Sequence, residues 1–249
     1  MFVLSSIIKI NIMKYSRYIF ISAVTLALFI LASCINCIEP QGDITTEKTK
    51  LDNFTKIEVS IPANIKIVTG DSAQISISSY ESYLSAISTK VIRGKLKLKG
   101  DICNASNDEV NIVITLPELS GIDIAGSASA YSETPVRTDE LTIEISGSGS
   151  ISLNVFANNI DCDINGSGNI NINGTCQRLR VDIAGSGEFK GLGLNSYKAV
   201  VDIAGSGNAS IVALNKLDAS VAGSGVISYS GEPKLKIDIS GSGKINKIN

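Results

Sequence analysis

Short stretches of alternating apolar and polar residues recur along the chain from about residue 53 onward. Such alternation places successive side chains on opposite faces of a strand, so each stretch is typical of a half-buried β-strand. In the first part of this region we expect strands at 57–61, 65–67, 75–77, 95–99 and 110–114. Between the third and the fourth of these, the spacing of Tyr83, Leu84, Ile87 and Val91 predicts one short helix.

A Gly-Ser-Gly phrase then takes over and returns every 18 to 21 residues. Six copies carry both glycines, and the first copy reads Gly126-Ser127-Ala128. A period near 20 residues is typical of a solenoid, in which each repeat forms one coil of a stack. The glycines of these turns are Gly126, Gly147, Gly149, Gly166, Gly168, Gly185, Gly187, Gly205, Gly207, Gly223, Gly225, Gly241 and Gly243.

The residues around each phrase form columns when the copies are aligned on its first glycine. The positions two and four residues before that glycine are apolar in every copy, and so is the position four residues after it. Each copy therefore predicts two strands, one before and one after the turn, with their apolar side chains inward. The outward position between the first two apolar ones holds Asp123, Glu144, Asp163, Asp182, Asp202, Ser220 and Asp238.

One such coil is not stable alone. Ordering about 20 residues costs ~20–40 kcal/mol of backbone entropy, whereas four or five buried side chains return only ~1.5–3 kcal/mol each. Stacked coils bury each other's apolar columns and pair each other's backbone groups. We therefore predict an all-β chain in which 121–249 form a parallel, right-handed β-helix of about seven coils. A β-sandwich is the alternative, which accounts for the strands but not for the column of isoleucines.

The residues around the Gly-Ser-Gly phrase exclude three kinds of chemistry there. A Walker-type phosphate loop needs GxxxxGK[ST], and the dinucleotide fingerprint needs a third glycine where Lys190 stands after Gly187. A hydrolase elbow needs a histidine partner, and the chain contains no histidine. Glycine instead suits a corner with unusual backbone angles and a close neighbouring coil. We therefore predict structural turns, with no catalytic residue and no cofactor.

The charges exclude one class of partner and leave one candidate site. With 22 basic and 24 acidic residues, the net charge of −2 gives no indication of a nucleic-acid partner. Stacking would bring the carboxylates of the acidic column within ~4.7–4.9 Å of each other, where a calcium ion between coils would relieve their repulsion. Solvated acids bonded to serine or backbone groups are the alternative. Because the calcium-binding GGxGxD turn is absent, no metal site is predicted.

The N-terminus has the features of a secretion signal. Lys14 and Arg17 precede an apolar run at 18–30, and Leu31-Ala32-Ser33-Cys34 resembles the bacterial lipoprotein box. We expect diacylation of Cys34 and membrane anchoring through its acyl chains; an ordinary secretory signal is the alternative. Ile35 stands directly after Cys34, where an aspartate would favour retention in the inner membrane, so we expect sorting to the outer membrane. The expected organisation is a signal peptide at 1–33, a lipidated cysteine and tether at 34–52, an N-terminal β section at 53–120 and the solenoid at 121–249.

Export also permits disulfide bonds. Four cysteines follow Cys34, and Cys162 with Cys176 is the closest pair within the predicted solenoid. Cys162 also stands where the repeat requires a small buried residue. The sequence leaves open whether these two are bridged.

Several phrases together resemble one known family. Phe54-Thr55-Lys56-Ile57-Glu58-Val59, Ile114-Thr115-Leu116-Pro117-Glu118-Leu119 and the Gly-Ser-Gly series are similar to the putative auto-transporter adhesin, head GIN domain family, over about 54–245. Gly168-Asn169-Ile170-Asn171 looks like the phrase behind the family's name. The resemblance implies a bacterial envelope protein with a β-helical fold. It brings no catalytic motif and no established biochemical activity.

Three functional hypotheses follow. The first is a non-enzymatic, lipid-anchored envelope protein that acts as a cell-surface adhesin or interaction module, with a surface protein, an envelope protein or a glycan as its ligand. The second is a carbohydrate-binding or carbohydrate-cleaving β-helix, although aromatic residues make up only 5% of the chain and leave few platforms for sugar stacking. The third is a structural or signalling envelope component. No obvious cap stands near Asn249, so association through ends or edges is also open.

Overall fold

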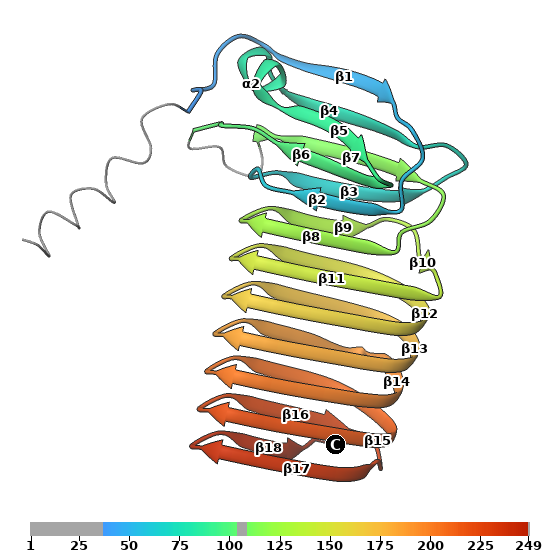
Figure 1. The fold of residues 1–249 in the computed structure, drawn as a ribbon, viewed down its shortest axis with the longest axis vertical. Helices are drawn as coiled ribbons and strands as arrows, with labels where there is room; N and C mark the ends of the chain where they lie inside the picture. The colour runs from blue at the N-terminus through green and yellow to red at the C-terminus, as the bar shows by residue number, and fades with distance from the viewer. Residues whose placement is uncertain (1–36, 104–108, 249) are drawn as a thin grey trace, which may run out of the picture. The chain divides into compact units, whose positions relative to one another are not determined.

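The computed structural model describes residues 37–103 and 109–248. The predicted signal peptide and Cys34 lie outside these residues. Ile38–Asn249 form one compact unit built from stacked β-strands (Figure 1). Its elements are β1 (Ile44–Lys50), β2 (Lys56–Val59), β3 (Asn64–Thr69), β4 (Gln74–Tyr80), α2 (Glu81–Ala86), β5 (Ser88–Ile92), β6 (Lys95–Lys99), β7 (Asn111–Leu116), β8 (Gly121–Gly126), β9 (Ser129–Ser132), β10 (Val136–Arg137), β11 (Glu140–Gly147), β12 (Ser150–Gly166), β13 (Asn169–Gly185), β14 (Glu188–Gly205), β15 (Asn208–Gly223), β16 (Val226–Ser230), β17 (Lys234–Gly241) and β18 (Lys244–Lys247).

Each coil contributes one strand to each of two layers. The front layer contains β6, β2, β8, β11, the C-terminal halves of β12 to β15, and β17; the back layer contains β7, β3, β9, the N-terminal halves of β12 to β15, β16 and β18. Neighbouring strands within these layers are parallel. Seen from the N-terminal end, the chain turns clockwise as it moves away from the viewer, so the coil is right-handed (Figure 1). The predicted β-solenoid of about seven coils is confirmed.

The predicted inward columns form the core. At the position two residues before each turn glycine, the side chain is buried in every coil except the last, as at Ile145, Ile164 and Ile183. In the coil of β17 the corresponding residue is Ile239, which is exposed because no other strand of the described residues lies on that side of it. Burial therefore depends on the neighbouring coil, as the energetics of a single coil require.

The Gly-Ser-Gly turns connect the front layer to the back layer along one edge. The first glycine of every turn has a positive φ, from +114° at Gly241 to +132° at Gly147, where a side chain is strained. The second glycine is needed for another reason: a Cβ added to Gly207 would lie 2.6 Å from Ile183 Cγ2 of the preceding coil. The serine between them donates its backbone N–H across coils, as from Ser186 to the Gly166 oxygen at 2.8 Å.

The N-terminal section continues the same two layers and closes them at that end. β2 pairs with β8 and β3 pairs with β9, so β2 and β3 form one more coil, with 60–63 in place of a Gly-Ser-Gly turn. β6 and β7 pair in parallel with β2 and β3, and beyond them the pairing becomes antiparallel, with β5 on β6, β4 on β7, and β1 on β4. β1 lies inside the segment expected as a tether.

The helix differs from the prediction. α2 ends at Ala86, and Ile87 is already extended, with φ −78° and ψ 116°. Val91, expected on the helix, lies in β5 opposite Leu96 of β6. Pairing with β6 therefore outweighs the helical spacing. The β-branched residues of this stretch also favour a strand over a helix.

The cysteines fall into two groups. Cys162 and Cys176 are buried free thiols, so the open question of a bridge between them is answered in the negative. Burial raises the pKa of Cys176 to about 12, which leaves this thiol protonated and unreactive at neutral pH. Cys37 and Cys103 are disulfide-bonded.

Candidate functional site

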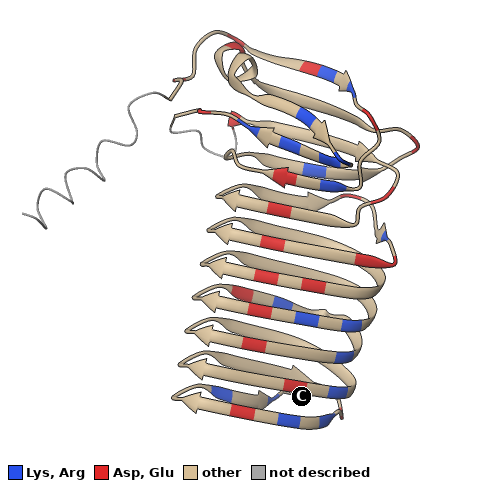
Figure 2. Cartoon of the chain, viewed as in Figure 1, with Lys and Arg blue, Asp and Glu red and all other residues tan. Residues whose placement is uncertain are grey.

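The outer face of the front layer carries a column of basic residues. Arg178, Lys198, Lys216 and Lys234 occupy the same register position in four successive coils, one side chain per strand. Neighbouring strands are ~4.7–4.9 Å apart, so the four cations form a ladder along the stacking axis. Figure 2 shows this column toward the ends of the front strands away from the Gly-Ser-Gly edge.

The predicted acidic column runs parallel to it on the same face. The register aligns Asp123, Glu144, Asp163, Asp182, Asp202, Ser220 and Asp238, and β2 adds Glu58 above them. The pKa values of Asp123, Asp163 and Asp202 are raised, first by desolvation and then by the neighbouring carboxylates of the column. The face therefore presents two parallel stripes of opposite charge.

A groove lies over the basic column. It has a volume of about 430 Å³ and is lined by Arg178, Arg180, Lys198 and Lys216, with Glu140 and Asp161 among the other lining residues. Its edge toward the acidic column is set by an ion pair between Arg180 Nε and Asp182 Oδ2 at 2.7 Å. This hydrogen bond raises the pKa of the Arg180 guanidinium further. The groove thus brings four basic side chains together with two acidic ones.

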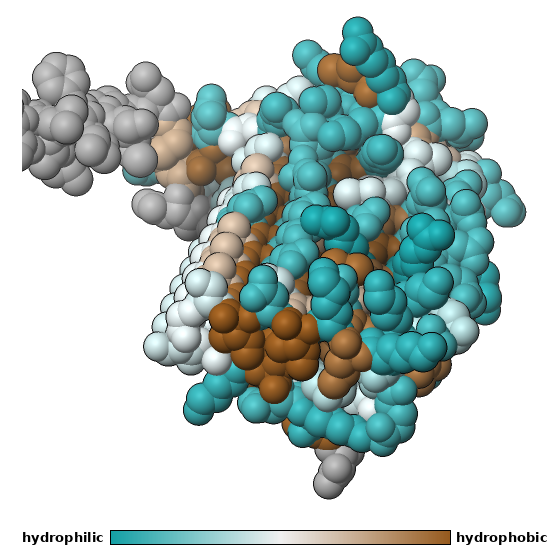
Figure 3. All heavy atoms as spheres, turned by 60° about the horizontal axis from the view of Figure 1, so that its bottom comes forward, coloured by the Kyte–Doolittle hydropathy of each residue, from teal (hydrophilic) through white to brown (hydrophobic). Residues whose placement is uncertain are grey.

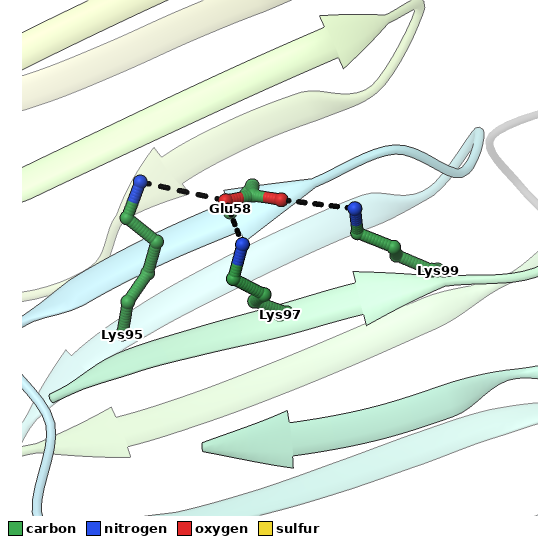
Figure 4. Close-up of polar contacts among 4 residues, drawn as sticks. All are labelled: Glu58, Lys95, Lys97 and Lys99. Atoms are coloured by element: carbon green, nitrogen blue, oxygen red, sulfur yellow. Dashed lines mark hydrogen bonds and ion pairs between the residues drawn. The ribbon is translucent and has the colours of Figure 1, made fainter. Parts of the chain in front are cut away.

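A second charged cluster lies at the N-terminal end of the same face (Figure 4). Three lysines of β6, alternating along the strand, converge on Glu58 of β2: Lys97 at 2.8 Å, Lys99 at 3.2 Å and Lys95 at 3.4 Å. The hydrogen bond from Lys97 is the largest cause that lowers the pKa of Glu58, and the result is a pKa of about 2 despite desolvation. Glu58 therefore stays ionised and ties β6 to β2.

This cluster gives a pH-dependent contribution to stability with a defined sign. The unfolded chain takes up a proton at Glu58 near pH 4.5, whereas the folded chain does so only near pH 2. The stabilisation is complete above about pH 4.5 and is lost as the pH falls toward 2. Because the lysines are partly exposed and screened, we expect a loss of only ~1–2 kcal/mol. Glu58→Gln should remove this part of the pH dependence in urea unfolding, and Glu133→Gln, at an exposed pair with Lys66, should not.

The acidic column has the opposite linkage. A raised pKa means that the folded chain disfavours the charged form of Asp163, so stability decreases as the pH rises through the folded pKa, and the cost is present in full at pH 7. We expect Asp163→Asn to raise the unfolding free energy at pH 7 by ~0.5 kcal/mol. Asp161→Asn, on an exposed neighbouring position of the same strand, is the control and should change it less. Thermal unfolding at pH 7 distinguishes the two, and a destabilised Asp163→Asn would contradict this account.

The other predicted residues are distributed as follows. The turn glycines lie along the edge of the stack, away from the basic column. No group of three or more His, Cys, Asp or Glu side chains with the arrangement of a metal site occurs within 37–103 and 109–248. None of the helices described there is both long and apolar enough to cross a membrane.

Sequence reasoning found the acidic column but missed the basic one. The signal was present, since Arg178, Lys198, Lys216 and Lys234 all stand seven residues before a turn glycine. The cluster at Glu58 had no comparable signal, because β2 and β6 are about 40 residues apart in the chain and belong to different coils.

Comparisons with known proteins agree with this architecture. The family model described as "Putative auto-transporter adhesin, head GIN domain" matches residues 53–233. A crystal structure described as a "putative adhesin" from Bacteroides fragilis is 25% identical, with a TM-score of 0.80, and the match covers 85% of this chain and 100% of the other. A "putative lipid binding protein" from Parabacteroides distasonis is 28% identical, with a TM-score of 0.72 and coverage of 86% and 100%.

A third structure, described as a "putative adhesin" from Parabacteroides merdae, is 19% identical with a TM-score of 0.69, covers 86% of this chain and 100% of its own, and supports the fold alone. No curated protein matches the chain. The family model begins after β1 and ends before β17, so it covers more than half of the chain and most of the stack. The chain therefore belongs to the family described as the putative auto-transporter adhesin, head GIN domain.

Proposed function

We propose that the protein is a non-enzymatic, lipid-anchored adhesin or interaction module of the bacterial outer membrane, and that it contacts its partner with the outer face of the front layer. The observation that carries this proposal is the pair of in-register charge columns on one flat face, with the groove over the basic column. Side chains held at a fixed ~4.8 Å spacing by a stack of strands form a pre-organised surface, which lowers the entropic cost of binding an elongated ligand.

Export and anchoring are supported by independent features. The lipoprotein-like phrase ending at Cys34 supports acylation. The disulfide-bonded Cys37 and Cys103 are typical of a chain that folds in an oxidising compartment. The absence of histidine from the chain removes the usual general base at neutral pH, which supports a binding role.

Cell fractionation tests the anchor. The full chain should partition with the outer membrane and incorporate labelled palmitate, and Cys34→Ser should abolish both. Cys37→Ser, three residues away, is the matched control and should keep the label. Palmitate incorporation by Cys34→Ser would refute the lipoprotein assignment.

Surface exposure is tested on intact cells. A non-permeant lysine-reactive biotin reagent should label the protein before lysis to the same extent as a known surface protein. Labelling only after lysis would place the protein in the periplasm and refute cell-surface adhesion.

The binding face is tested with charge-reversed variants. Lys198→Glu combined with Lys216→Glu should weaken binding of the labelled full chain to isolated cell envelopes, and the effect should shrink at high salt. Lys48→Glu combined with Lys50→Glu, both on β1, which pairs with β4 beside the back layer, keeps the same net charge change away from the front face and should bind as the wild type. Equal loss in both double variants would refute a specific role for the front face.

Carbohydrate binding is the second candidate, and the basic groove favours one class of sugar. Cations in register suit the repeated carboxylates of a uronate polymer better than a neutral glycan, for which the face offers few aromatic platforms. Retention of the full chain on immobilised polygalacturonate, with loss in the Lys198→Glu/Lys216→Glu variant, would support this candidate. Unretained wild-type protein would exclude it.

A further inference from the structure

The C-terminal end of the stack leaves core positions uncovered. Leu235, Ile237 and Ile239 of β17 are 47%, 46% and 43% exposed, whereas the residues at the same positions one coil earlier are 0–1% exposed. Figure 3 looks onto this end and shows a patch of strongly apolar surface there. The three side chains point inward, so a further strand beside β17 would bury them in the same way as β17 buries those of β15.

The backbone of β17 also has N–H and C=O groups directed toward its unpaired edge, where another strand could bond to them. In these parallel layers an outward residue uses its N–H and C=O toward the preceding coil, as Thr142 does when it donates to the Ser120 oxygen at 3.1 Å. Inward residues therefore use theirs toward the following coil. For Leu235, Ile237 and Ile239 that side is the free edge of β17, with which no other strand of the described residues pairs. The edge thus combines unpaired backbone groups with uncovered apolar side chains, the combination that favours strand addition.

The opposite end of the stack does not offer a matching surface. Its outermost strands are β1, which is exposed throughout and reads ITTEKTK, and β5, which reads STKVI. Both are antiparallel edge strands with lysines, and the core beneath them is closed by Tyr83 of α2, which is fully buried. Head-to-tail stacking of two copies would therefore place a polar edge on the uncovered core of β17.

We propose that a second copy of this chain covers the C-terminal end, with β17 pairing antiparallel to β17 of the other copy around a two-fold axis at Ile237. In this register Ile237 faces Ile237, and Leu235 faces Ile239. Lys236 faces Asp238 on both sides of the axis, so that opposite charges meet directly across the strands. Each front layer continues into the other, and the exposed apolar residues become part of one shared core.

Other symmetric registers are worse. Centring the axis on Lys236 or on Asp238 would place two like charges opposite each other, at a Cα separation of only about 4.5 Å. Centring it on Ile239 would set Lys236 and Asp238 against serines and Ile237 against Gly241. Axes between residues would pair inward with outward side chains. The charge pattern KLKIDIS is therefore self-complementary in one register only. This pairing also closes the assembly at two copies.

Directed cross-linking tests the register in the full chain. Two differently tagged copies, one carrying Lys236→Cys and the other Asp238→Cys, are co-expressed and oxidised in isolated membranes. We expect a disulfide-linked species that contains both tags, and little or none when either variant is expressed alone. Asp238→Cys with Ser220→Cys, one coil inside the edge, is the matched control and should not cross-link. Equal cross-linking in the control, or none in the test pair, would overturn the proposal.

The mass of the purified full chain tests the interface itself. Light scattering in detergent should give two copies per particle for the wild type and one for Ile237→Lys, which sets two ammonium groups on the two-fold axis. Leu214→Lys alters a residue that is 51% exposed away from this edge and should remain dimeric. Lys236→Asp should weaken the dimer, and adding Asp238→Lys should restore it, since the pairing is then reversed but intact. A monomeric wild type, or a dimeric Ile237→Lys, would refute the interface, and neither result bears on the front-face binding tests.

Discussion

Gly185→Ala is expected to destabilise the stack by ~3–5 kcal/mol. Gly185 has φ +124°, and a Cβ added to it would lie 2.5 Å from the Gly166 oxygen of the preceding coil. A methyl group there is strained by the backbone conformation and also pushes against a backbone atom that cannot rotate away. The two coils would have to separate locally, which weakens the hydrogen bond from Ser186 to Gly166.

A control within the same repeat separates these two costs. Gly126 has φ +129°, but nothing lies within 4 Å of a Cβ added to it. Gly126→Ala should therefore cost only the conformational strain, ~1–3 kcal/mol. The difference between the two variants in guanidinium unfolding measures the close approach of coils. Equal losses would mean that backbone conformation alone explains the glycines.

Phe189→Ala is expected to cost ~3–5 kcal/mol. Phe189 is fully buried and lies in register between Ile170 and Ala209 of the neighbouring coils. It is the large member of an otherwise smaller column, and its ring extends over Gly191, where an added Cβ would lie 2.5 Å from the ring carbon Cε1. Removing the ring leaves a cavity that a stack of strands held by its hydrogen bonds cannot close.

The same contact supplies a double-mutant cycle. Gly191→Ala should destabilise the wild type, because the new methyl group overlaps the Phe189 ring. In the Phe189→Ala background the methyl group enters the cavity instead, so its cost should fall or change sign. Phe189→Leu is the conservative control and should lose less than Phe189→Ala. Additive losses in the cycle would show that the ring does not rest on Gly191.

The sequence predicts the solenoid well because the solenoid is a local structure repeated. The inward orientation of Ile164 can be predicted from the phrase Gly166-Ser167-Gly168, which begins two residues later. The neighbouring coils carry the same pattern. The prediction therefore needs no long-range information beyond the period.

The N-terminal section could not be predicted in this way. β1 is polar at nearly every position and has no alternation to detect, because both of its faces are exposed, and only its pairing with β4 makes it a strand. Val91 has helical spacing from Ile87, yet its partner Leu96 decides its conformation. The cluster at Glu58 likewise depends on which strands become neighbours. These features lie at the end of the stack, where the repeat no longer dictates the partner of each strand.

The in-register turns have a consequence for how such molecules can vary. Every coil from β11 to β15 pairs with the coil before it and with the coil after it in the same way, with the turn glycines and the inward columns in register. A segment of 18 to 20 residues between equivalent glycines, such as 186–205, can therefore be duplicated or deleted without changing either terminus of the stack. Each such step changes the height of the molecule by about 4.8 Å. Chains built on this fold can thus differ in height by whole coils while the outward charge columns keep their register.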